Sequence, residues 1–67
     1  MASKNQIISA ARRAIDAVGN AEGLAEDYSV DDSHTANFRS IAESAFHLLE
    51  DAEHKIFQAI QLMSRLE

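Results

Sequence analysis

The 67-residue sequence contains no cysteine, no proline and no tryptophan, and glycine occurs only at positions 19 and 23. The absence of cysteine excludes disulfides and a cysteine nucleophile. The absence of proline removes the strongest helix breaker, and alanine, the best helix former, is abundant. A chain this short is near the limit at which one hydrophobic core suffices. With disulfides excluded, a metal or oligomerisation is expected to support the fold.

Long apolar runs and clustered positive charge are also missing. No segment is long enough to cross a bilayer, and no apolar run of signal-peptide length follows Met1. The sequence therefore predicts a soluble cytoplasmic protein that does not bind membranes. Six basic residues against eleven acidic ones give a net charge of -5, which opposes nucleic-acid binding and favours a basic partner protein. Without a glycine-rich phosphate loop or a nucleophile elbow, we expect no enzyme activity and no cofactor.

Two segments show apolar or small residues at alternating steps of four and three, the spacing of a heptad repeat. The first series contains Ile7, Ala11, Ala14, Val18, Ala21, Ala25 and Tyr28. The second contains Phe38, Ala42, Ala45, Leu49, Ala52, Ile56, Ala59, Met63 and Leu66. These series predict one helix over about residues 4–28 and another over about 36–66, with a polar loop at about 29–35.

Local signals mark the ends of the helices. Ser3 and Gln6 have the spacing of a capping box, which predicts the start of the first helix. Gly19 and Gly23 weaken this helix, so a break over residues 19–23 is an alternative to a continuous helix. The candidates for the second N-cap are Asp32, Ser33 and Thr35.

The predicted fold is all-α, with residues 1–67 forming a single domain. A short loop between two long helices requires an antiparallel two-helix hairpin if the apolar stripes are to meet. Both stripes are wider than a two-helix pair needs, which predicts a homodimer that forms a four-helix bundle. The residues expected at the dimer interface are Ile8, Ile15, Ile41, Leu48 and Leu62. A monomer with exposed apolar residues, or a patch that binds a different protein, is the alternative.

One polar pattern has the composition of a metal site. Glu43, His47, Glu50 and His54 share one face of the second predicted helix, but that face points away from Leu49 and therefore toward water. We interpret the pattern as exposed Glu–His pairs and predict no metal site. His47 and His54 are the only weak candidates for metal ligands.

The charges are distributed unevenly along the predicted hairpin. No lysine or arginine lies between Arg13 and Arg39, so negative charge gathers near the loop and positive charge near the chain ends. This asymmetry predicts an acidic end that attracts a basic partner. Its candidate partner-binding residues are Glu26, Asp27, Asp31 and Asp32. Phe46 and Phe57 lie at the edge of the apolar stripe, where they either pack within the bundle or anchor a partner.

The sequence is therefore typical of a small acidic interaction module. We predict that it binds a partner protein as a homodimer and regulates or inhibits that partner. The alternatives are a purely structural dimerisation or assembly unit and, with less support, a metal-binding helical bundle.

Overall fold

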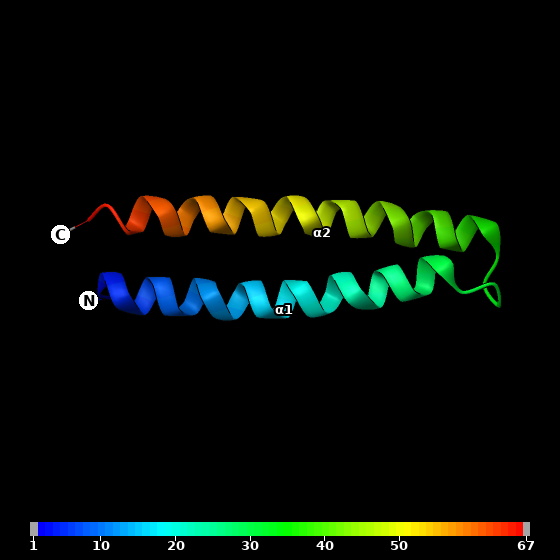
Figure 1. Ribbon diagram of the computed structural model, residues 1–67, viewed down its shortest axis with the longest axis horizontal. Helices are drawn as coiled ribbons and strands as arrows, with labels where there is room; N and C mark the ends of the chain where they lie inside the picture. Colours follow the sequence, from blue (N-terminus) through cyan, green and yellow to red (C-terminus); the bar gives the residue numbers. More distant parts are fainter. Residues whose placement is uncertain (1, 67) are drawn as a thin grey trace.

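A computed structural model describes residues 2–66 and shows two helices that lie side by side and antiparallel (Figure 1). Helix α1 covers Lys4–Val30 and helix α2 covers Ala36–Met63. The hairpin is a rod with extents of 51 × 15 × 14 Å, and the start of α1 and the end of α2 lie at the same end of the rod. The predicted all-helical hairpin is confirmed. We call the end that holds the loop the acidic end and the other the open end.

The predicted capping box forms at the start of α1. The backbone N–H of Gln6 donates to Ser3 Oγ (3.2 Å), and the backbone N–H of Ser3 donates to Gln6 Oε1 (2.8 Å). From there α1 runs without a break through Gly19 and Gly23. Neither glycine has a positive φ angle, and a Cβ atom added to Gly23 would meet nothing within 4 Å. The glycines are therefore not required by the backbone conformation.

Thr35 is the N-cap of α2, which decides among the three candidates. Its Oγ1 atom accepts a hydrogen bond from the backbone N–H of Phe38 (3.2 Å), and this satisfies one of the free amides of the first turn. At the other end, the Ser64 hydroxyl donates to the carbonyl oxygen of Ile60 (2.8 Å).

The two helices meet along a line of half-buried side chains that we call the seam. On α1 the seam consists of Lys4, Ile8, Ala11, Ile15, Val18, Glu22, Ala25 and Ser29. On α2 it consists of Arg39, Ala42, Phe46, Leu49, Glu53, Ile56, Ile60 and Met63. Both series alternate steps of four and three residues, so each occupies one face of its helix.

This seam is rotated relative to the predicted one. Every second position of the predicted series, such as Val18 and Leu49, belongs to both, and most of the remaining positions, such as Ile7 and Tyr28, are exposed. The predicted series follows the middle of each apolar stripe, whereas the helices pair through one flank of it. The rotation brings polar residues into the seam and leaves the other flank uncovered.

The hairpin on its own has no buried core. No side chain among residues 2–66 is buried, because each helix has a single neighbour. Ten large apolar side chains of this range are exposed, among them Leu48 at 71% and Val30 at 69%.

Candidate functional site

The uncovered flanks of the two stripes form one continuous surface, which we call the apolar face. The α1 residues of this face are Ile7, Ala10, Ala14, Ala17, Ala21, Leu24 and Tyr28. The α2 residues are Phe38, Ile41, Ala45, Leu48, Ala52, Lys55, Ala59, Leu62 and Leu66. Each series again alternates steps of three and four, so each follows its helix along its length. Lys55 is the one charged residue in these two series.

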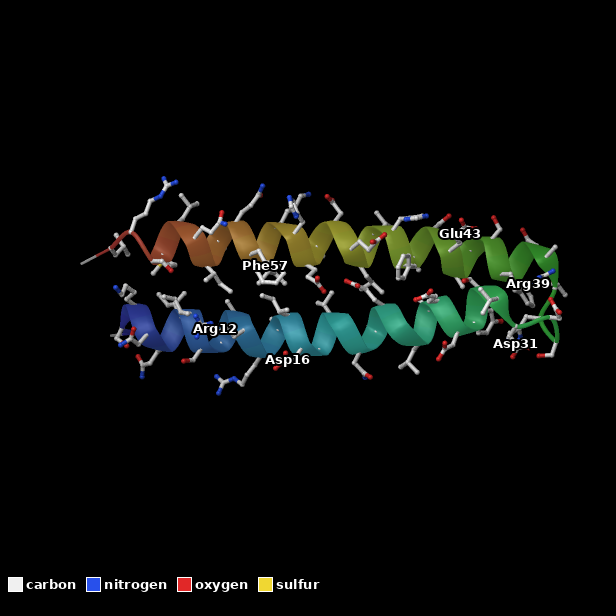
Figure 2. The ribbon with its side chains drawn as sticks, viewed as in Figure 1. Arg12, Asp16, Asp31, Arg39, Glu43 and Phe57 are labelled. Carbon is white, nitrogen blue, oxygen red and sulfur yellow. The ribbon has the colours of Figure 1, made fainter. Side chains whose placement is uncertain are left out.

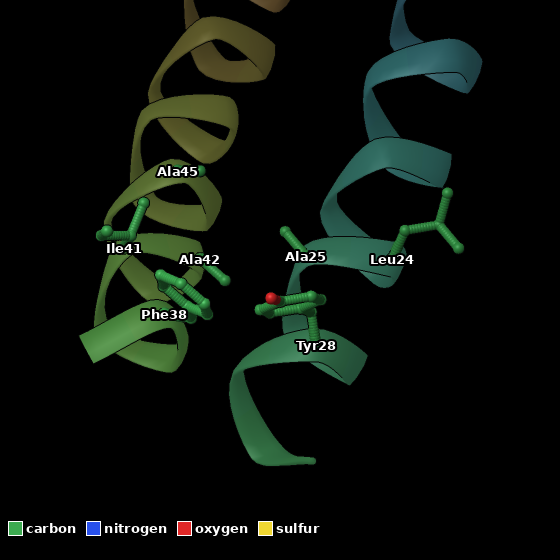
Figure 3. Close-up of a pocket in the computed structure, with 7 residues that line it drawn as sticks. All are labelled: Leu24, Ala25, Tyr28, Phe38, Ile41, Ala42 and Ala45. Carbon is green, nitrogen blue, oxygen red and sulfur yellow. The ribbon is translucent and has the colours of Figure 1, made fainter. Parts of the chain in front are cut away.

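A groove at the acidic end shows that the two series lie on the same side of the hairpin. It has a volume of about 400 Å³ and is lined from both helices (Figure 3). Tyr28 and Phe38 face each other across it, and Leu24 and Ile41 project from the outer sides of α1 and α2. The apolar face therefore spans both helices.

The predicted dimer-interface residues divide between two places. Ile41, Leu48 and Leu62 lie on the apolar face and are 59%, 71% and 60% exposed. Ile8 and Ile15 are half-buried in the seam. The reason is the rotation of the helices: the flank that carries Ile8 and Ile15 packs toward α2, and the opposite flank remains open.

The opposite side of the hairpin, which we call the polar face, carries a smaller hollow near the acidic end. The hollow has a volume of about 300 Å³ and is lined by Glu26, Ser29, Val30, Glu43, Phe46 and His47. Phe46 is half-buried in the seam, and its ring meets that of His47 edge to face at 5.6 Å. Phe57 is 46% exposed and is labelled between the two helices in Figure 2. Of the two predicted anchors, Phe57 is thus the more accessible.

The Glu–His pattern lies on exposed surface, as the spacing indicated. His47 Nδ1 lies 3.1 Å from Glu50 Oε1, and His47 Nε2 lies 3.8 Å from Glu43 Oε1. All three side chains are at least half exposed. Within the described range, no group of three histidine, aspartate or glutamate side chains could hold a metal ion. His54 is exposed and lies two turns along α2 from His47.

The loop at the acidic end is held by its own carboxylates. Asp31 Oδ1 accepts a hydrogen bond from the backbone N–H of Ser33 (2.9 Å), and Arg39 Nη1 donates to Asp32 Oδ1 (3.3 Å). The rings of Tyr28 and His34 stack at 3.7 Å. The hydrogen bonds from Ser33, with smaller contributions from the charges of His34 and Arg39, lower the pKa of Asp31 below its ordinary value of 3.8.

Charge is distributed along the rod as predicted. Between residues 17 and 51 there are eight acidic residues and one basic residue, Arg39. Glu26, Asp27, Asp31 and Asp32 are all exposed there. The described remainder, residues 2–16 and 52–66, has five basic residues and two acidic ones. The acidic end is therefore strongly negative and the open end positive.

Sequence reasoning missed a carboxylate pair inside the seam. Glu22 and Glu53 are half-buried, and Glu22 Oε1 is shielded from solvent. Burial, hydrogen bonding with Glu53 and the negative charges of Glu53 and Glu50 together raise the pKa of Glu22 above its ordinary value of 4.5. Ile8, Ile15 and Glu22 are spaced seven residues apart, and this spacing would have placed Glu22 at the seam.

Comparisons of the chain with protein-family models, with curated proteins and with solved structures give no match. Over the described residues, neither helix combines the length and the apolar character needed to cross a bilayer.

Proposed function

We propose that this protein is a non-enzymatic interaction module that dimerises through its apolar face into a four-helix bundle and binds a partner protein. The observation that carries the proposal is the apolar face itself. A single hairpin leaves this face in water along both helices, and continuous apolar patches of this kind mark interaction surfaces. In a twofold-symmetric dimer the same surface of each copy forms the interface, so a second copy can cover the apolar face and no other gene product is needed.

The exposed area supports a dimer over a monomer. The hairpin exposes 5119 Å², whereas a compact monomer of its mass exposes about 4200 Å². Two separate hairpins expose about 10,200 Å², and a compact body of twice the mass exposes about 7000 Å². A dimer that reached this compactness would bury about 3000 Å² in total, which lies within the range of obligate homodimers.

The partner-binding surface of the proposed dimer is the acidic end with the adjoining polar face. Both remain in water when the apolar face is covered, because they lie on other sides of the hairpin. Glu26 and Asp27 form no ion pair with residues 2–66 and are free to meet lysine or arginine side chains. Binding there would regulate or inhibit a partner with a basic surface, and Phe57 offers a partly exposed apolar contact farther along α2.

A purely structural assembly unit is the second candidate, because the apolar face supports dimerisation but does not by itself require a further partner. Metal binding has less support, since His47 already lies against two carboxylates and His54 lies apart from it.

The dimer is tested by light scattering on the purified protein. A mass near twice the chain's 7.4 kDa supports the proposal, and a compact species of 7.4 kDa over the whole accessible concentration range refutes it.

Partner binding is tested by affinity capture with three immobilised baits of the same helicity and oligomeric state. The first is the wild type, the second carries Glu26→Gln with Asp27→Asn, and the third carries Asp16→Asn with Asp51→Asn. The last two have the same net charge, but only the second changes acidic residues close to the loop. A protein retained by the first and third baits and lost by the second supports the proposal. Capture of nothing but the protein itself favours the structural unit.

A further inference from the structure

The α2 part of the apolar face is symmetric in side-chain size about Ala52. Alanines lie seven residues away on each side, at Ala45 and Ala59, and large apolar residues lie fourteen residues away, at Phe38 and Leu66. The positions between them carry long side chains on both sides, Ile41 and Leu48 before the centre, Lys55 and Leu62 after it, and these match about the centre to within one residue. Reversing the direction of this helix therefore places large residues on large ones and alanines on alanines.

The α1 part of the face has the same symmetry from Ile7 to Leu24, with Tyr28 lying outside the symmetric stretch. Ile7 and Leu24 enclose four alanines, at positions 10, 14, 17 and 21, so the centre lies between Ala14 and Ala17. A symmetric pattern on one helix is weak support for a symmetric pairing of two copies. Symmetric patterns on both helices are stronger support, provided that their centres lie at the same level along the rod.

The hairpin aligns the two centres. At the open end, Lys4 Nζ donates to the carbonyl oxygen of Leu66 (2.7 Å), and at the acidic end Tyr28 faces Phe38 across the groove. The midpoint between residues 4 and 28 is position 16, and the midpoint between 38 and 66 is position 52. One twofold axis perpendicular to the helices can thus relate both halves of the apolar face at once.

Charge favours this axis over the alternative. A twofold axis parallel to the helices would place the two acidic ends together and the two positive ends together. The perpendicular axis places each acidic end, with its eight acids, beside the open end of the second copy. The five basic residues at the open end are Lys4, Arg12, Arg13, Lys55 and Arg65. Opposite charges across an interface favour an arrangement, and like charges oppose it.

We infer that a second copy of this chain covers the apolar face in the antiparallel orientation, with α1 on α1, α2 on α2 and the two Ala52 residues on the twofold axis. This inference rests on the homodimer of the proposed function and adds its orientation. Lys55 then lies over the second copy's Leu48, with its apolar stem on the leucine and its ammonium group beside Asp51, 3.2 Å away in the hairpin. The two acidic ends, and any partners bound there, lie at opposite ends of the bundle.

The test is a distance measurement by pulsed electron paramagnetic resonance on nitroxide-labelled Asn37→Cys. Asn37 is exposed at the acidic end, fifteen residues from Ala52. The antiparallel dimer separates the two labels by about 45 Å along the helices. The parallel arrangement holds them within about 30 Å, across the width of a bundle. His54→Cys, exposed near mid-length, gives a short distance in both arrangements and shows that the labelled dimer has formed.

The outcomes separate the orientation from the dimer itself. A distance near 45 Å for Asn37→Cys with a short one for His54→Cys supports the inference. Short distances for both labels overturn the antiparallel orientation and leave the proposed dimer intact. A monomeric mass by light scattering, with no dipolar coupling from either label, overturns the dimer and the orientation together.

Discussion

Replacing Leu48 by alanine is expected to weaken the dimer far more than an equally exposed replacement on the polar face. Leu48 is 71% exposed in the hairpin, so most of its side chain can be buried only by the second copy. Leucine and alanine differ by three carbon groups, worth about 0.8 kcal/mol each when fully buried. Scaled by the exposed fraction of Leu48, the loss of dimerisation free energy is about 1.7 kcal/mol per copy and about 3.4 kcal/mol per dimer. The dissociation constant should therefore rise by about 250-fold.

Val30→Ala is the matched control. Val30 is 69% exposed, nearly the same as Leu48, but it lines the hollow on the polar face. Its replacement should change the dissociation constant by less than about threefold, since nothing in the dimer buries it. Sedimentation equilibrium over a dilution series measures both constants, and circular dichroism checks that helicity is kept. Equal effects of the two replacements, or no effect of Leu48→Ala, would refute the assignment of the apolar face as the interface.

Three further predictions concern the hairpin. Glu22→Gln should raise the melting temperature at neutral pH. The raised pKa of Glu22 means that the protonated side chain stabilises the folded state. This stabilisation by protonated Glu22 is complete below pH 4.5 and is lost as the pH rises through the folded-state pKa, whereas glutamine stays neutral at every pH. The advantage of the variant should therefore shrink as the pH falls toward 4.5, and a difference independent of pH would contradict this cause. Gly23→Ala should stabilise the protein by about 1 kcal/mol in urea denaturation, since the added methyl group meets no atom within 4 Å. Thr35→Ala should destabilise it by about 1 kcal/mol through loss of the α2 cap, with Thr35→Ser retaining most of the stability.

Much of the fold follows from local chemistry that the sequence displays. The spacing of Ser3 and Gln6 predicts the first cap, and the alternation of apolar residues predicts two long helices with one polar loop. These features depend on contacts within a few residues, which sequence patterns record directly. The choice of Thr35 over Asp32 and Ser33 depends on the path of the loop, where Asp31 and Asp32 are engaged by Ser33 and Arg39.

The rotation of the helices could not be predicted in the same way. Each apolar stripe is wide enough to contain two adjacent heptad series, one through Ile8 and Ile15 and one through Ile7 and Leu24. Sequence periodicity locates the middle of such a stripe, but which flank meets the neighbouring helix depends on every other surface that must be covered. The position of Glu22 in the seam follows from that choice, and so the carboxylate pair was missed.

The single hairpin buries no side chain among residues 2–66, and this affects how the protein is maintained in a cell. If side chains become fully buried only when two chains meet, folding and assembly are coupled, and the folded fraction depends on how many chains are present. At low concentration the chain would be unfolded and cleaved by proteases, and above a threshold concentration the dimer would resist proteolysis. Melting temperature should accordingly rise with protein concentration. The level of expression would then determine both the amount of this protein and the lifetime of each molecule.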